Sequence, residues 1–365
     1  MNTAKKRIMF FLPLLNGGGA ERVVLTLLKH LDKNRFEPIL VLLKNEGRYA
    51  GMVPEEIEVI DLQASQARNA VFKIIKIIRT RKPDIVFTTL AYLNLIIAML
   101  RPLFPKKTLF IARESNTVSI RNKREKYPRL FDWLYRHVYQ NFDLIITQAE
   151  FMKKDLITNY NIPPEKMVVI YNPVDTRTVT QLSTQTSADL PKNVCNLLAV
   201  GKLGYQKGFD LLLKAMCELD ERYYLTILGE GSDHEALQKQ IVENNLQNRV
   251  TLAGFAQNPY AFMKAADLLV LSSRFEGLPN VVLEANTCGT PVVAFDAAGG
   301  TGEIIHNGKN GFLVTPFDTR AFAQTIQKAC DYPFDHEAIK KETDQNFGIE
   351  KVIKTYEKLF TSGTF

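Results

Sequence analysis

The feature that most constrains this chain is a repeated alternation of short apolar segments with longer amphipathic ones. In the first half, the apolar segments lie at 7–14, 37–43, 84–88, 108–112 and 143–147, with helix-length stretches between them. Short apolar runs predict buried strands, and a helix between two such strands makes the strands parallel. The pattern therefore predicts an α/β fold in which helices cover a parallel sheet.

The alternation stops in the polar stretch TRTVTQLSTQTSADLPKN and then starts again. The second half predicts strands at 196–200, 223–228, 249–252, 267–271, 291–295 and 311–314. A chain of 365 residues is also too long for one ordinary hydrophobic core. We therefore expect two doubly wound, Rossmann-like domains in tandem, with a central cleft at the carboxyl ends of their strands.

The composition sets the expected boundaries. An N-terminal domain covers 1–175, a linker covers 176–193, and a second domain covers 194–345. A C-terminal helix over 346–365 could pack back on the N-terminal domain. The N-terminus has a basic start, but its apolar stretch is only about eight residues long and lacks a convincing cleavage site, so a first buried strand is favoured over a signal peptide.

The cysteines indicate neither a metal site nor a redox motif. Cys195, Cys217, Cys288 and Cys330 form no C-x-x-C pair and no metal-ligand spacing. We expect them to be small buried apolar side chains in a reducing cytoplasm.

Charge is unevenly distributed along the chain. Residues 1–180 carry 29 Lys and Arg against 17 Asp and Glu, a net charge of +12, whereas the rest carries 17 against 22, a net charge of −5. A basic half suggests that the N-terminal domain faces an anionic partner, for which nucleic acid and an anionic membrane surface both qualify.

Two stretches of the basic half bear on a membrane partner. The stretch VFKIIKIIRTRK (71–82) is either a helix packed on the sheet with a solvated basic edge or a helix lying on a membrane surface. The basic cluster SIRNKREKYPRL (119–130) favours the second reading slightly. The longest apolar stretch, 92–104, is too short to span a bilayer.

Three glycine-containing loops could bind phosphate. In LPLLNGGGAERV a strand runs into three glycines and a helix start, which suits either phosphate binding or a tight strand-to-helix turn. The spacing does not fit a dinucleotide fingerprint. In GKLGYQKG, Lys202 and Lys207 could clamp a diphosphate, or the loop could simply be solvated and basic.

The third loop is SSRFEGLPNVVLEA (272–285). Pro279 suits the first turn of a helix, and Gly289 suits its end. The helix dipole favours an acidic residue near the helix start, which accounts for Glu276. Glu284 lies about 7 Å along the helix, where the dipole does not account for an acidic residue. Carboxylates accept hydrogen bonds from hydroxyls but repel phosphate. A ligand with a sugar at each end of a diphosphate, that is a nucleotide sugar, would satisfy both glutamates.

Taken together, these motifs resemble the retaining glycosyltransferases of the GT-B fold, family 4. FEGLPNVVLE is the E-x7-E signature, and GGGAER, YNPVD, GKLGYQKG, LGEGSD, VTLAGF and GTPVVAFDAAGGTGEII complete the resemblance over nearly the whole chain. It is most similar to bacterial members that extend lipopolysaccharide core, O-antigen, capsule or lipid-linked glycans. The resemblance makes the first domain the acceptor side and the second the donor-binding side.

The resemblance implies roles for matching positions. Lys202 (arginine in many relatives) and Lys207 would hold the diphosphate, Glu284 the ribose, and Glu276 the hydroxyls of the transferred sugar. The other residues implied in donor binding are Gly18, Gly19, Gly201, Gly277, the backbone of Leu278, Pro279 and Asn280, and, around the base, Gly229, Gly231, Gly254 and Phe255.

One departure from the family pattern concerns the first domain. Many relatives have a histidine after the strand that matches 108–112, whereas this chain reads IARESN there. Either Glu114 or Arg113 takes over the substrate-positioning role, or the role is dispensable. The candidate catalytic residues are accordingly Glu276, Lys207, Lys202 and Glu114.

The expected reaction is transfer of a hexosyl or N-acetylhexosaminyl group from a nucleotide diphosphate sugar, with UDP favoured, to a glycan or lipid-linked acceptor. We expect no metal or other cofactor, since no D-x-D motif is present. We also expect a cytoplasmic enzyme in peripheral contact with the anionic inner membrane, without nucleic acid. The alternatives are a non-enzymatic nucleotide- or nucleic-acid-binding protein, or another GT-B enzyme such as a phosphorylase or, less favoured, an epimerase.

Overall fold

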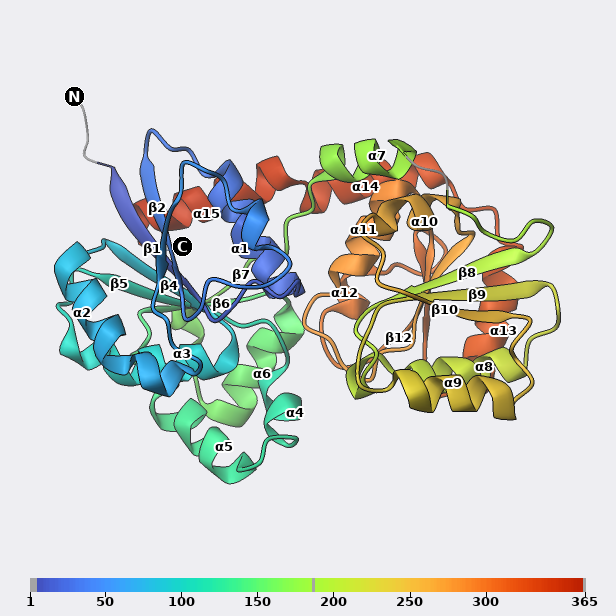
Figure 1. Ribbon diagram of the computed structural model, residues 1–365, viewed down its shortest axis with the longest axis horizontal. Coiled ribbons are helices and arrows are strands. Elements are labelled where there is room, and N and C mark those ends of the chain that lie inside the picture. Colours follow the sequence, from blue (N-terminus) through green and yellow to red (C-terminus); the bar gives the residue numbers. More distant parts are fainter. Residues whose placement is uncertain (1–4, 186–187, 364–365) are drawn as a thin grey trace. The chain divides into compact units, whose positions relative to one another are not determined.

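The computed structural model describes residues 5–185 and 188–363 and divides them into two compact units. Unit 1 comprises the chain up to Pro173 together with the segment from Glu350 onward, and unit 2 comprises Val174–Ile349. Each unit contains one parallel sheet with helices packed against it (Figure 1). The predicted α/β architecture of two doubly wound domains is confirmed.

The unit 1 sheet, as far as the described residues show, has seven strands in the order β3-β2-β1-β4-β5-β6-β7. The strands are β1 (Lys6–Leu12), β2 (Phe36–Leu42), β3 (Glu58–Asp61), β4 (Ile85–Thr89), β5 (Leu109–Arg113), β6 (Leu144–Thr147) and β7 (Met167–Val169). The helices are α1 (Gly19–His30), α2 (Val71–Arg81), α3 (Ala91–Leu100), α4 (Val118–Asn122), α5 (Pro128–His137) and α6 (Glu150–Tyr160). The sequence pattern did not predict β3 and β7, which are short.

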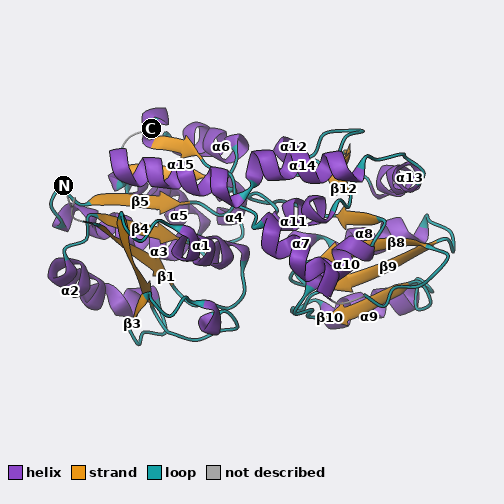
Figure 2. Cartoon of the chain, turned by 90° about the horizontal axis from the view of Figure 1, so that it is seen from above, coloured by secondary structure: helices purple, strands orange, loops and turns teal. Residues whose placement is uncertain are grey.

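The C-terminal helix α15 (Ile349–Ser362) packs on the unit 1 sheet, as Figure 2 shows. Its Phe360 is fully buried and makes ring contacts with Phe10 of β1, Phe36 of β2 and Phe87 of β4. The Lys6 ammonium also donates to the Phe360 carbonyl at 3.1 Å. Burial of one aromatic side chain against three strands ties the end of the chain to its beginning.

The unit 2 sheet, again over the described residues, has six strands in the order β10-β9-β8-β11-β12-β13. The strands are β8 (Cys195–Val200), β9 (Tyr223–Leu228), β10 (Val250–Gly254), β11 (Leu268–Leu271), β12 (Val292–Phe295) and β13 (Gly311–Val314). The helices are α7 (Thr176–Gln185), α8 (Phe209–Cys217), α9 (His234–Glu243), α10 (Pro259–Ala265), α11 (Asn280–Cys288), α12 (Thr301–Ile304), α13 (Thr319–Cys330) and α14 (His336–Phe347). Figure 1 shows α8, α9 and α13 on one side of this sheet and α7, α10, α11 and α14 on the other.

The predicted linker is wrong over its first part, because residues 176–185 form helix α7 of unit 2. Val179 is buried, and the Asn258 side chain at the start of α10 donates to the Leu182 carbonyl at 2.8 Å. Threonine and serine, which recur through this stretch, have lower helix propensity than Ala or Leu, so the composition indicates a loop. Packing against α10 and α11 overrides that propensity.

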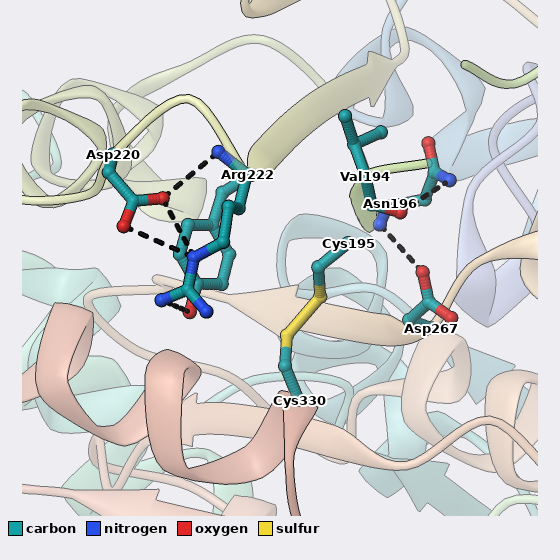
Figure 3. Close-up of a disulfide and its surroundings, with 8 residues drawn as sticks. Val194, Cys195, Asn196, Asp220, Arg222, Asp267 and Cys330 are labelled. Atoms are coloured by element: carbon teal, nitrogen blue, oxygen red, sulfur yellow. Dashed lines mark hydrogen bonds and ion pairs between the residues drawn. A yellow bond between two sulfur atoms is a disulfide. The ribbon is translucent and has the colours of Figure 1, made fainter. Parts of the chain in front are cut away.

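The expectation for the cysteines is wrong for three of the four. Cys195 at the start of β8 and Cys330 at the end of α13 form a disulfide (Figure 3). Cys217 is a free thiol but is exposed, and only Cys288 is both free and buried. The bridging pair is 135 residues apart in the sequence, and no local spacing marks such a pair.

The long apolar and basic stretches form ordinary helices of unit 1. In α2, Ile74 and Ile78 are buried in the core, while Phe72 is 85% exposed. Within 5–185 and 188–363, no helix combines the length and apolarity that crossing a bilayer requires.

Candidate functional site

The sheet of unit 2 reverses its strand order between β8 and β11, which are hydrogen-bonded neighbours although two strands separate them in the sequence. Ligands of doubly wound sheets bind at such a point, outside the carboxyl ends of the strands. The loop after β8 carries Gly201, Lys202 and Lys207, and the loop after β11 carries Ser273 and Glu276. The topology therefore brings the predicted lysine and glutamate loops to one place.

Four contacts hold these two loops together. Gly208 has a φ of +63°, and a Cβ there would lie 2.2 Å from the Ser272 carbonyl oxygen, so only glycine fits. The Arg274 amide donates to the Gln206 carbonyl at 2.8 Å, and the Ser272 hydroxyl donates to the Lys207 carbonyl at 3.0 Å. The Gln206 side chain donates to the Phe275 carbonyl at 3.1 Å.

Lys207 and Glu276 form an ion pair at the centre of this arrangement. The ammonium lies 2.7 Å from Glu276 Oε1, and the two side chains are only 19% and 7% exposed. The lysine side chain passes over Gly201, where a Cβ would lie 2.8 Å from Lys207 Cε. Lys207 therefore lies against the Gly201 backbone, whereas Lys202 is exposed.

Sequence reasoning missed two further parts of the site. The first is Ser273, which is buried and donates to Glu276 Oε1 at 2.6 Å. The second is the loop 298–300, because the Glu276 amide donates to the Ala298 carbonyl at 2.9 Å and the Gly300 amide donates to the Gly277 carbonyl at 2.6 Å. The two glycines of the motif AAGG indicate a tight loop at 298–300. Ser273 lies three residues before Glu276 in the sequence, but nothing in the sequence assigns it a role.

Helix α11 begins after Pro279, which is its N-cap and not part of its first turn as predicted. It ends before Gly289, whose left-handed φ of +86° suits the helix end that the sequence predicted there. Every residue of α11 except Asn280 is buried, including Glu284 at 8% exposed. Leu278 is also buried. A carboxylate in the interior of a covered helix is costly unless other groups compensate for its charge, so Glu284 is a candidate for function rather than for solubility.

The glycines predicted around the base have a packing role in the structure. A Cβ at Gly229 would lie 1.8 Å from the Gly201 carbonyl oxygen, and one at Gly231 would lie 2.1 Å from the Leu203 carbonyl oxygen. The glycines therefore let the loop after β9 approach the loop after β8. Gly254 has a φ of +73° and nothing near its Cβ position, and Phe255 beside it is 51% exposed.

Arg274 supports the lysine loop from the side. Its guanidinium donates to both oxygens of Asp210 at 2.8 and 2.6 Å and lies over the Tyr205 ring, 4.2 Å from the centroid. Burial acts to raise the pKa of Asp210, but the hydrogen bonds and charge of Arg274 outweigh it and hold that pKa below its usual value. A cavity beside this pair is lined by Tyr205, Asp210 and Arg274 but by none of the predicted donor residues.

In unit 1, a side chain of α1 occupies two amides of the glycine loop. Gly18 is the N-cap of α1, Gly19 is its first residue, and the Glu21 carboxylate accepts from the Gly17 and Gly18 amides at 2.7 and 3.0 Å. A carboxylate from the same chain occupies the donors that a phosphate would need. The structure thus favours the tight-turn interpretation for these two amides.

Glu114 lies in the interior of unit 1, so its substrate-positioning role stays a prediction. Its carboxylate is 1% exposed and accepts hydrogen bonds from Tyr139 and from Tyr135 at 3.0 Å, while Arg121 lies 3.6 Å away. Burial, and to a smaller extent the charge of Glu114, raises the pKa of Tyr139 well above its usual value. The Tyr139 hydroxyl therefore keeps its proton and donates a hydrogen bond to Glu114. Arg113 is fully buried too. Tyr135 on α5 and Tyr139 just after it lie 21 and 25 residues from Glu114 in the sequence, so no local motif links them to it.

Among the described residues, no group of three or more His, Cys, Asp or Glu side chains is arranged to hold a metal ion.

Comparison with known proteins assigns the family. The model described as Glycosyltransferase Family 4 matches residues 17–178, and that described as Glycosyl transferases group 1 matches residues 184–346. The chain is also 32% identical over 321 residues to the N-acetylgalactosamine-N,N'-diacetylbacillosaminyl-diphospho-undecaprenol 4-alpha-N-acetylgalactosaminyltransferase of Campylobacter jejuni, covering 85% of this chain and 86% of that protein. The chain is a family 4 glycosyltransferase.

Other relatives of the glycosyltransferase agree. An uncharacterized glycosyltransferase of Methanocaldococcus jannaschii is 30% identical over 80% of this chain and 82% of its own length. The crystal structure of Anabaena HepE in complex with UDP-glucose superposes with a TM-score of 0.80 at 20% identity, covering 98% of this chain and 99% of that chain. The glycosyltransferase thus has the GT-B fold, and the alternative of a non-enzymatic binding protein is wrong.

Proposed function

We propose that this glycosyltransferase transfers a hexosyl or N-acetylhexosaminyl group from a UDP-sugar to a growing cell-surface or lipid-linked glycan, with retention at the anomeric carbon. The observation that carries the proposal is the Lys207–Glu276 pair at the strand-order reversal of unit 2. It sets a cation for a diphosphate and a carboxylate for sugar hydroxyls side by side.

Each part of the donor then has a partner. Lys207 and Lys202 bind the diphosphate, Glu276 accepts from hydroxyls of the transferred sugar, and Glu284 accepts from the ribose. The start of α11 provides amides and the positive end of a helix dipole for the sugar-phosphate region. The base is bounded by Gly229, Gly231, Gly254 and Phe255.

The chemistry follows from the charge that develops on the leaving group. When the bond between the anomeric carbon and the phosphate oxygen breaks, the nucleoside diphosphate gains negative charge, which the lysines and helix amides stabilise. The leaving phosphate oxygen accepts the proton of the attacking acceptor hydroxyl on the same face, so the reaction needs neither a separate base nor a metal ion.

Relatives supply the substrate classes. The name of the Campylobacter enzyme specifies an acceptor glycan on diphospho-undecaprenol and an N-acetylgalactosaminyl donor group. HepE was solved with UDP-glucose. For this chain we propose a UDP-N-acetylhexosamine donor and a lipid-linked acceptor.

We also propose a cytoplasmic enzyme that touches the anionic inner membrane through α5. Arg129, Leu130, Trp133, Arg136 and His137 recur at helical spacing and are all exposed. Basic and aromatic side chains on one helix face suit the headgroup region of an anionic bilayer. In sedimentation with vesicles containing phosphatidylglycerol, L130S/W133S should reduce binding more than F72S on α2, and equal reductions would contradict the assignment.

The decisive experiment for the proposed function is a donor screen. Calorimetry should detect binding of UDP-glucose, UDP-N-acetylglucosamine or UDP-N-acetylgalactosamine in preference to GDP-, ADP- and dTDP-sugars, and Glu284→Ala should remove it. If no nucleotide sugar binds, or if the variant binds as well as the parent, the donor-site assignment is wrong.

A further inference from the structure

Two adjacent serines follow β11, and both are about 1% exposed. Their hydroxyls have different partners. Ser272 donates to the backbone carbonyl of Lys207 at 3.0 Å, and Ser273 donates to Glu276 Oε1 at 2.6 Å. One serine therefore holds the lysine loop, and the other holds the carboxylate.

Glu276 Oε1 receives two donors, the Ser273 hydroxyl at 2.6 Å and the Lys207 ammonium at 2.7 Å. The two donors differ in how firmly they are fixed. Ser273 is a one-torsion side chain directly after a buried strand, whereas Lys207 has a flexible four-carbon stem. A diphosphate that draws on the Lys207 ammonium would weaken its bond to Glu276 but would leave the bond from Ser273 intact.

We propose that Ser273 is a positioning residue that fixes the Glu276 carboxylate for the transferred sugar. The inference rests on the proposed function, in which Glu276 meets the sugar and not the nucleotide. Because Ser273 acts only through Glu276, it affects the sugar part of the donor selectively. A residue that merely kept the loop folded would affect UDP and the UDP-sugar alike.

The test compares binding of UDP with binding of the UDP-sugar that the parent prefers among UDP-glucose, UDP-N-acetylglucosamine and UDP-N-acetylgalactosamine. Ser273→Ala should weaken binding of the UDP-sugar about ten-fold, as expected for loss of a hydrogen bond to a charged group, and change UDP binding less than about two-fold. Ser273→Thr keeps the hydroxyl and should stay within about three-fold of the parent for both.

The control is Ser183→Ala. Ser183 is also buried, but its hydroxyl donates to the Thr180 carbonyl within α7, so neither ligand should bind differently. Thermal melting of each variant verifies that it is folded. Donor hydrolysis adds a kinetic readout, in which Ser273→Ala should lower kcat/KM while the inhibition constant of UDP stays constant.

Each contrary result has a distinct meaning. Equal weakening of UDP and UDP-sugar would assign Ser273 to loop structure, and no weakening of either would show that Glu276 needs no support; both overturn the inference. A loss in Ser273→Thr as large as in Ser273→Ala would also overturn it. If the parent binds UDP but discriminates no sugar, the inference fails, whereas a parent that binds no nucleotide refutes the proposed function itself.

Discussion

Lys207 and Glu276 form an ion pair with 2.7 Å between the ammonium and a carboxylate oxygen, and both side chains are largely buried. In the proposed function, the two residues serve opposite ends of the bond that breaks. Glu276 therefore competes with the diphosphate for the same ammonium.

This competition predicts that substitutions of Lys207 and of Glu276 change UDP affinity in opposite directions. Lys207→Met should weaken UDP binding roughly ten-fold or more and reduce its salt dependence, because a charge-assisted contact is lost. Glu276→Gln should bind UDP as tightly as the parent or a few-fold more tightly, yet transfer sugar about 100-fold more slowly. Calorimetry measures the UDP affinity of each variant, and a transfer assay measures its rate of sugar transfer. Equal weakening of UDP binding in the two variants would contradict the separation of roles.

The Asp210–Arg274 pair predicts a pH-dependent contribution to stability. The folded-state pKa of Asp210 is lowered, so its contribution is present above the unfolded value, near pH 4, and is lost as the pH falls through the folded value. The Asp210 side chain is 41% exposed, so solvent screening limits the contribution to about 1 kcal/mol, or roughly 2–4 °C in melting temperature.

Asp210→Asn should accordingly melt below the parent at pH 6, and the difference should shrink as the pH falls below about 4. Glu243→Gln removes the exposed Lys239–Glu243 pair and should leave the melting temperature unchanged at either pH. A difference between Asp210→Asn and the parent that is the same at pH 3 and pH 6 would show that the lost interaction is not electrostatic.

The sequence predicted the fold well where burial and periodicity act locally. Strands such as β9 and β13 and the end of α11 at Gly289 lie where the apolar runs and the glycine indicated. Helix α7 was missed because its stability comes from packing against α10 and α11, which a polar sequence does not reveal. The Cys195–Cys330 bridge was missed because its ends meet only in the folded chain.

For the candidate site, the sequence indicated which loops meet but not which side chains contact one another. The lysine and glutamate loops could be paired from motifs, because βα loops of a parallel sheet gather at one edge. Which atoms touch could not be predicted, so Ser273 went unassigned. The glycines at 229 and 231 were assigned to a ligand, although the close approach of two backbones already requires them.

The predicted substrate-positioning role of Glu114 can be tested by substitution. Glu114→Gln removes the charge facing Arg121 inside unit 1 and should destabilise the protein by roughly 3 kcal/mol, as expected when one member of a buried ion pair is removed. Donor binding by the folded variant should equal that of the parent. The measurements are urea unfolding and calorimetry. Normal stability combined with lost transfer would support the substrate-positioning role of Glu114.

The disulfide predicts how the four cysteines react. Denatured, non-reduced protein should take up two alkyl groups, at Cys217 and Cys288, and reduced protein should take up four. In the folded, non-reduced protein, Cys217 should react first because it is exposed, whereas burial, together with the charge of Glu284, raises the pKa of Cys288 to about 12 and keeps its thiolate scarce. Mass spectrometry of the alkylated peptides identifies each site.

The same bridge should contribute to the stability of unit 2. It closes a loop of more than a hundred residues between β8 and α13, so its loss in Cys330→Ala should cost roughly 2–4 kcal/mol under oxidising conditions and nothing in excess of a reductant. Cys217→Ala, at a cysteine outside the bridge, is the matched control and should show no such dependence on the reductant. A Cys330→Ala variant as stable as the parent without reductant would mean that the bridge only links residues already fixed by the surrounding core.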